Sequence, residues 1–151
     1  MPDMVRDVMT PDVLILSPRD TVVRAAVLMR DQDIGALPVG EDDRLIGMLT
    51  DRDIVRRTTA QGLVPSDARV GDAMTKGILY CFDDDSCDDA AISMAANGIR
   101  RLPVVNRERR LVGIVSLGDL AKWGAEESAA EALAVICQAS HGGYVGQLPG
   151  A

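Results

Sequence analysis

The heptapeptide Gly47-Met48-Leu49-Thr50-Asp51-Arg52-Asp53 decides the fold, because its pattern returns as Gly113-Ile114-Val115-Ser116-Leu117-Gly118-Asp119. Both stretches have the form Gly-x-x-Thr/Ser-x-x-Asp and lie 66 residues apart. The residues in front of them match at the same offset, since Leu45-Ile46 corresponds to Leu111-Val112. The chain therefore contains an internal repeat, which has to be recognised before any single element is assigned.

The repeat extends toward the N-terminus of each copy. At an offset of 65 residues, the segment ending in Met9-Thr10 matches the segment ending in Met74-Thr75, and Leu37-Pro38-Val39 matches Leu102-Pro103-Val104. A unit of about 60 residues is marginally stable alone, so we expect the two copies to pack together with pseudo-two-fold symmetry, sheets inside and helices outside. The expected domains are a first repeat at 5–60, a linker at 61–69, a second repeat at 70–124, and a C-terminal helix and flexible tail at 125–151.

Each copy predicts the same order of elements: strand, helix, strand, strand, helix. In the first copy we expect a strand at 13–16, a helix from Thr21 to Gly35, strands at 36–39 and 45–49, and a second helix after Thr50. Residues 126–138 predict one further amphipathic helix. The glycine-rich residues 141–151 predict a flexible tail.

Composition excludes several classes of function. The 151 residues carry a net charge of −7, which disfavours nucleic acid and anionic membranes. Three cysteines without CxxC spacing predict neither disulfides nor zinc, and the single histidine leaves no His-based catalytic triad. No apolar stretch is long enough for a membrane span, and the first residues do not form a signal peptide. Together with the cysteine pattern, which fits a reducing cytoplasm, this predicts a cytoplasmic protein. The sequence shows no nucleophile–base pair, metal cluster or P-loop, so we expect no enzymatic activity.

The repeat resembles a tandem pair of CBS domains, the arrangement often called a Bateman module. The resemblance covers residues 5–123 and is carried by the two Met-Thr lead-ins, the two Leu-Pro-Val strands and the paired Gly-x-x-Thr/Ser-x-x-Asp motifs. It is greatest for the small stand-alone bacterial CBS-pair proteins, some of which are tied to stress or hypoxia responses. It implies an α/β (α+β) fold of two β-α-β-β-α repeats.

The resemblance also implies a function. Such pairs commonly bind adenosine-containing ligands in clefts between the repeats, so the expected ligand is AMP, ADP or ATP, with S-adenosylmethionine or NAD less expected and no cofactor required. The resemblance implies a homodimer as well, and the apolar helix stripes Ala25-Ala26-Met29 and Ala90-Ala91-Met94 suit close helix packing. A nucleotide-binding homodimer of this kind can also have a further protein partner, whose identity the sequence does not give.

Carried over residue by residue, the resemblance gives two unequal sites, with Asp at the ribose, Thr or Ser at the ribose or phosphate, and basic residues at the phosphates. An ionised Asp can accept two hydrogen bonds from a vicinal diol. The first expected site consists of Thr10, Ile34, Arg100, Arg101, Ile114, Ser116 and Asp119. The second consists of Thr50, Arg52, Asp53, Arg56 and Thr75. Because Gly35-Ala36 replaces Arg100-Arg101 in the first repeat, we expect the site of Asp119 to bind phosphate better.

Alternatives remain open for these residues and for the whole chain. Thr50-x-x-Asp53 and Ser116-x-x-Asp119 are also helix capping patterns, and the arginines can belong to solvated turns or exposed helix faces. The alternative function is a CBS-fold stress or interaction protein that binds no nucleotide. A third is the regulatory part of an enzyme, since CBS pairs regulate inosine monophosphate dehydrogenases. The acidic run Asp83 to Asp89 predicts a helix N-terminus, with Cys87 as an inert thiol.

Overall fold

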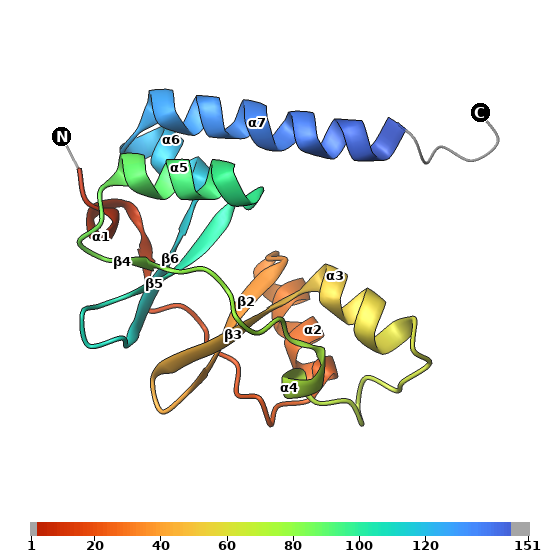
Figure 1. The fold of residues 1–151 in the computed structure, drawn as a ribbon. Coiled ribbons are helices and arrows are strands. Elements are labelled where there is room, and N and C mark those ends of the chain that lie inside the picture. Colours follow the sequence, from red (N-terminus) through yellow and green to blue (C-terminus); the bar gives the residue numbers. More distant parts are fainter. Residues whose placement is uncertain (1–2, 146–151) are drawn as a thin grey trace. The chain divides into compact units, whose positions relative to one another are not determined.

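The computed structural model describes residues 3–145, and these divide into two compact units (Figure 1). Unit 1 consists of the residues up to Pro11, Tyr80–Arg107, and the chain from Val112 onward. Unit 2 consists of Asp12–Leu79 and Glu108–Leu111. The compact units therefore differ from the linear repeats, because the N-terminal segment lies with the second repeat.

Unit 1 is built on a four-stranded sheet of strand order β1-β6-β5-β4. β1 pairs with β6 antiparallel, and β4 pairs with β5 parallel. Helix α7 packs against α5 and α6, and Figure 1 shows these three helices on the same side of the strands. The elements are α1 (Val5–Val8), β1 (Thr10–Pro11), β4 (Cys81–Phe82), α5 (Cys87–Asn97), β5 (Arg101–Val105), β6 (Leu111–Ser116), α6 (Leu117–Trp123) and α7 (Glu126–Val145).

Unit 2 is built on the antiparallel hairpin of β2 and β3. Asp42 and Asp43 form its turn with φ values of 53° and 64°, the left-handed conformation that a tight hairpin turn requires at both central positions. Helix α3 continues directly into a π-helical turn, η1. The elements are α2 (Val22–Gln32), β2 (Ala36–Glu41), β3 (Arg44–Thr50), α3 (Asp51–Ile54), η1 (Val55–Thr59) and α4 (Val70–Ala73).

The lead-in of each repeat completes the unit formed by the other repeat. In unit 1, Thr10 pairs with Ile114 of β6. In unit 2, Thr75 forms the corresponding bridge with Met48 of β3. The backbone N–H of Thr75 donates to the carbonyl of Met48 at 2.8 Å, and the N–H of Met48 donates back at 3.0 Å. We call this arrangement the lead-in exchange.

Each unit has its own aliphatic core, and the helical stripes proposed for a dimer contact lie inside these cores. Ala25 and Met29 are buried in unit 2, and Ala90, Ala91 and Met94 are buried in unit 1. These side chains are already packed within the chain, so they give no support for contact with a second copy. The homodimer stays a prediction.

The strand expected at 13–16 is wrong in length. Only Leu16 forms a bridge, a parallel one to Val39, and Leu14 and Ile15 are exposed. The ladder cannot continue beyond Leu16, because the N–H of Ser17 donates to the Asp20 carboxylate at 2.8 Å and Pro18 has no N–H to donate. The turn thus fixes the C-terminal end of the pairing at Leu16, as predicted, whereas residues 13–15 of the predicted strand form no bridge.

Two helix ends also differ from the sequence prediction. Helix α2 begins at its expected cap, Thr21, but ends at Gln32, and Asp33 rather than Gly35 takes the left-handed C-cap position at φ 52°. In the second repeat the corresponding cap is a glycine, Gly98, at φ 65°. Helix α7 continues to Val145, beyond the predicted end at residue 138, and residues 146–151 of the predicted tail lie outside the described residues.

Candidate functional site

The two Gly-x-x-Thr/Ser-x-x-Asp motifs form reciprocal capping boxes at the starts of α3 and α6. The Asp53 N–H donates to Thr50 Oγ1 at 3.0 Å, and the Thr50 N–H donates to Asp53 Oδ2 at 3.0 Å. In unit 1 the Asp119 N–H donates to Ser116 Oγ at 3.0 Å, and the Ser116 N–H donates to Asp119 Oδ2 at 2.9 Å. The capping interpretation is therefore confirmed, and it uses one carboxylate oxygen of each Asp.

In unit 2 the second oxygen of the motif carboxylate faces a partner from the same unit. Thr75 Oγ1 lies 3.4 Å from each carboxylate oxygen of Asp53, and Arg57 Nη1 lies 3.8 Å from Asp53 Oδ1. The same guanidinium nitrogen donates to the carbonyls of Ala73 and Met74, at 3.1 and 2.9 Å, and to Thr75 Oγ1 at 3.2 Å. We call this cluster the Arg57 clamp.

Among the described residues of unit 1, there is no equivalent of the Arg57 clamp. At the repeat offset of 66, Trp123 stands in the place of Arg57. Its ring lies 5.0 Å from Lys122 Nζ, and the residue is 56% exposed. Within the described part of the chain, the Asp119 carboxylate has only the backbone N–H of Ser116 as a hydrogen-bond partner. Its other oxygen therefore remains available to a ligand hydroxyl.

The segment before the Leu-Pro-Val strand also differs in charge between the units. In unit 1 the Arg100 carbonyl accepts from the Leu117 N–H at 2.8 Å, which places both arginines beside the start of α6. In unit 2 the carbonyl of Gly35 accepts from the Asp51 N–H at 3.0 Å. A β-carbon on Gly35 would lie 3.0 Å from Asp51 Oδ2. A carboxylate thus occupies the region where the second repeat has arginine.

Arg100 and Arg101 are exposed, and neither forms an ion pair with a carboxylate of the described residues. The Arg100 guanidinium lies 3.7 Å from the Cys137 thiol of α7, and sulfur is a weak acceptor. Both arginines therefore keep donors available for an anion.

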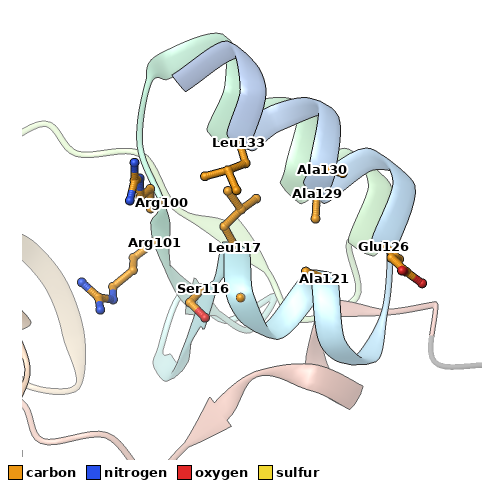
Figure 2. Close-up of a pocket in the computed structure, with 10 residues that line it drawn as sticks. Arg100, Arg101, Ser116, Leu117, Ala121, Glu126, Ala129, Ala130 and Leu133 are labelled. Carbon is orange, nitrogen blue, oxygen red and sulfur yellow. The ribbon is translucent and has the colours of Figure 1, made fainter. Parts of the chain in front are cut away.

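A pocket of about 730 Å³ opens in unit 1 beside these arginines (Figure 2). It lies between α6, α7 and the start of β5. Its lining residues are Arg100, Arg101, Ser116, Leu117, Gly118, Ala121, Glu126, Ala129, Ala130 and Leu133. Figure 2 shows Arg100 and Arg101 at one end, Glu126 at the other, and Leu117 and Leu133 between them.

The first predicted site is only partly contained in this pocket. Arg100, Arg101 and Ser116 line it, whereas Asp119 and the strand-paired Thr10 and Ile114 lie in unit 1 outside the lining. Ile34 belongs to unit 2 and packs against the core of that unit. The residues contributed by α7 were missed, because an amphipathic helix at 126–138 gives no sign of which surface it covers.

The second predicted site is brought together in part. Thr50, Asp53 and Thr75 meet in unit 2, whereas Arg52 and Arg56 are exposed without an ion pair among the described residues. The arginine that reaches Asp53 and Thr75 is Arg57, which is not among the residues predicted for this site. Its i,i+4 spacing from Asp53 was the available signal, because residues four apart share a helix face.

The two buried cysteines, Cys81 and Cys87, are not placed as nucleophiles. Burial, together with Asp85 and Asp83, raises the pKa of Cys81 to about 12. Burial and the nearby Asp7, Asp88 and Asp3 also raise the pKa of Cys87. A protonated, buried thiol is a poor nucleophile, so Cys87 is inert as predicted. Among the described residues, no group of three or more His, Cys, Asp or Glu side chains is placed to hold a metal ion.

Comparison with known proteins identifies the repeat. The family model described as "CBS domain" matches residues 5–59 and 70–126. Hypoxic response protein 1 of Mycobacterium tuberculosis is 41% identical over 133 residues, which cover 87% of this chain and 92% of that protein. The CBS domain-containing protein YhcV of Bacillus subtilis is 46% identical over 133 residues, which cover 87% of this chain and 94% of that protein.

Solved structures agree with this similarity. The structure of hypoxic response protein I with two coordinated zinc ions has a TM-score of 0.74 and 42% identity, covering 80% of this chain and 98% of that chain. The structure of CBSX2 in complex with AMP has a TM-score of 0.70 and 31% identity, and the match covers 80% of this chain and 94% of that chain. The CBS domain pair of MJ0100, in complex with 5′-methylthioadenosine and S-adenosyl-L-methionine, has a TM-score of 0.71 and 26% identity, covering 81% and 95%.

Similarity to an enzyme is confined to part of that enzyme. The inosine-5′-monophosphate dehydrogenase of Methanocaldococcus jannaschii is 36% identical over 117 residues, which amount to 22% of its length. The relatives matched over nearly their whole length are stand-alone CBS proteins.

A search of the described residues for a helix able to cross a membrane found none.

Proposed function

The chain belongs to the CBS-domain family and carries two CBS repeats, and on this premise we propose that it is a non-catalytic sensor that binds an adenine nucleotide mainly through unit 1. One observation carries the proposal. Unit 1 combines a motif carboxylate with an available oxygen, Asp119, and two arginines, Arg100 and Arg101, that form no ion pair with a carboxylate of residues 3–145.

These groups match the two ends of a nucleotide. The available oxygen of Asp119 can accept hydrogen bonds from the ribose hydroxyls, while its other oxygen keeps the capping box closed. Arg100 and Arg101 offer charge-assisted hydrogen bonds to phosphate, and Ser116 lies between the two ends of the site. Thr10 and Ile114, paired on the neighbouring strands, are the residues proposed to border the ligand.

Unit 2 is proposed to bind phosphate-bearing ligands more weakly. Asp53 already faces Thr75 and Arg57, so a ribose would have to displace an internal partner. Asp51 lies beside Gly35, where the second repeat has Arg100, and a carboxylate there repels phosphate. A single charge-assisted hydrogen bond contributes roughly 1.5–3 kcal/mol, so a tenfold difference in affinity between the units is expected.

The identity of the ligand rests on relatives. The CBSX2 structure holds AMP, and the MJ0100 pair holds 5′-methylthioadenosine and S-adenosyl-L-methionine. Because unit 1 presents two arginines that form no ion pair with a described carboxylate, we propose AMP, ADP or ATP ahead of S-adenosylmethionine or NAD, with no catalytic cofactor. A cytoplasmic homodimer, with the repeats at 5–60 and 70–124 and ligand clefts between them, completes the proposal.

Isothermal titration calorimetry with AMP and ATP tests the proposal. Asp119→Asn keeps the shape of the capping residue but removes the charge, and we expect it to weaken the tighter binding event at least tenfold. The matched substitution Asp53→Asn is expected to spare that event. Native mass spectrometry of the purified protein provides an independent view of bound nucleotide. Equal losses in both variants, or no binding to the parent protein, would reject this assignment.

A ligand-free interaction protein is the second candidate. It is favoured by unit 2, where Asp53 is satisfied internally and Val23, Val27 and Val55 are exposed on α2 and η1. Exposed apolar side chains of this kind suit a protein partner. If calorimetry finds no nucleotide binding in the parent protein, this candidate takes precedence.

A further inference from the structure

The pocket between α6 and α7 has walls of hydrocarbon. Leu117 and Leu133 face each other across it, and Ala121, Ala129 and Ala130 complete the sides (Figure 2). These side chains offer neither donors nor acceptors to a ligand. A base or sugar buried against them would lose its hydrogen bonds to water without replacement. The walls therefore favour an aliphatic ligand.

The space exists because small residues stand where the other repeat has large ones. Gly118 and Ala121 of α6 correspond, at the offset of 66, to Arg52 and Val55. Opposite them, α7 contributes Ala129 and Ala130. The volume of about 730 Å³ lies within the range of roughly 300–1,000 Å³ that small-molecule sites occupy.

The two ends of the pocket carry opposite charges. Arg100 and Arg101 lie at one end without a carboxylate partner among the described residues, and Glu126 lies at the other. Ser116 Oγ, also in the lining, already accepts from the Asp119 N–H. A carboxylate is therefore attracted to the arginine end and repelled from the Glu126 end, which gives an amphiphile one orientation.

We propose that this pocket binds a free aliphatic monocarboxylate of the medium-chain fatty-acid class. The carboxylate lies at Arg100 and Arg101, and the alkyl chain lies between α6 and α7 against Leu117 and Leu133. This site goes beyond the proposed nucleotide site, because Asp119 does not line it. The two sites share the arginines, so fatty acid and nucleotide compete for them.

Calorimetry with octanoate, decanoate and dodecanoate, below their micelle-forming concentrations, tests the proposal on the full chain. We expect affinity to rise about tenfold for each two added carbons, because each buried CH₂ contributes a nearly constant increment. The double variant Arg100→Gln/Arg101→Gln is expected to lose at least tenfold in decanoate affinity. 1-Decanol, which lacks the charge, is expected to bind both proteins equally. Binding of decanol as tight as that of decanoate to the parent protein would overturn the assignment of the head group.

A pair of alanine substitutions on α7 locates the chain. Ala130 lines the pocket and is exposed, so Ala130→Trp is expected to fill the space without disturbing the core and to abolish decanoate binding. Ala134 is also exposed on α7 but lies outside the lining, and Ala134→Trp is expected to bind like the parent. Equal binding by both variants, or no binding of any chain length to the parent, would refute the pocket.

Two further readouts separate this proposal from the nucleotide proposal. Asp119→Asn is expected to weaken the tighter nucleotide-binding event at least tenfold and to keep decanoate binding, whereas Ala130→Trp is expected to keep the nucleotide event and to lose decanoate binding. Cys137 is exposed beside Arg100, while Cys81 and Cys87 are buried. Bound decanoate is therefore expected to slow alkylation of the single reactive thiol, and an unchanged rate at saturating decanoate would contradict the placement of the head group.

Discussion

A β-carbon on Gly113 would lie 2.6 Å from the carbonyl oxygen of Thr10, and the same relation holds between Gly47 and Thr75, at 2.8 Å. No side chain fits at these positions, because real β-carbons do not approach an oxygen that closely. The glycine that opens each repeated motif is thus explained by the lead-in exchange, since the backbone of the lead-in strand lies directly against it.

Gly113→Ala is expected to lower the free energy of unfolding by about 1–3 kcal/mol, because strand β1 must move away from β6. Gly118→Ala is the matched control. Its β-carbon would meet only Ser116 Oγ at 3.6 Å, an ordinary contact within helix α6, so the change is expected to be neutral or stabilising. Urea denaturation measures the free energy of unfolding of both variants. A Gly113→Ala protein as stable as the parent would contradict the close contact.

Arg57→Gln is expected to lower the free energy of unfolding by about 1 kcal/mol, because the guanidinium donates to the carbonyls of Ala73 and Met74. Arg56→Gln is the control, because it removes a neighbouring exposed arginine that forms no ion pair with a described residue. It is expected to change the free energy of unfolding by less than about 0.5 kcal/mol. Thermal unfolding of the two variants compares them. Equal losses would mean that the Arg57 clamp contributes only general charge.

Thr58→Val is expected to raise the free energy of unfolding by about 1 kcal/mol. Thr58 is fully buried in η1, and its hydroxyl oxygen has no hydrogen-bond partner within the described part of the chain. An unsatisfied buried hydroxyl is destabilising, whereas a methyl group of the same shape is not. Thr59→Val, at the adjacent exposed position, controls for the change in residue type. Chemical denaturation measures the free energy of unfolding of the parent protein and the two variants. Destabilisation by Thr58→Val would reveal a partner for the hydroxyl.

The stability difference between the parent protein and Cys81→Ala is expected to narrow at alkaline pH. Burial raises the pKa of Cys81 from 9.0 to about 12, so the folded state keeps a proton that the unfolded state releases. The stability from this thiol is complete below pH 9 and declines as the pH rises toward 12, on the order of 1 kcal/mol per pH unit. Urea titrations at pH 7 through 10 measure the difference, and a constant value would contradict the shift.

The elements that the sequence predicted well depend on short-range patterns. The helix caps at Thr21, Thr50 and Ser116 are formed by residues within three positions of one another, so their spacing is visible in the chain. The repeat likewise gives the hairpins, because matching apolar positions and polar turns recur at a constant offset.

The features that escaped prediction depend on long-range contacts. The i,i+4 spacing connects Arg57 with Asp53, but it does not predict that Arg57 also reaches carbonyls 16 and 17 residues away. The surface that α7 covers depends on how its small residues meet α6. At residues 13–16 the apolar pattern predicts a strand, yet pairing needs a neighbouring strand, and only Leu16 meets one, at Val39.

The lead-in exchange has a consequence for cutting the chain. A fragment ending in the segment 61–69 would carry the strand Thr10–Pro11 without β6, and a β3 without the Thr75 bridge. The remaining fragment would carry β6 without the strand Thr10–Pro11, and Thr75 without its partner in β3. Each half therefore offers what the other lacks, and the connecting segment acts by raising their effective concentration. The two repeats therefore depend on each other as the two subunits of a heterodimer do, with the difference that one chain joins them.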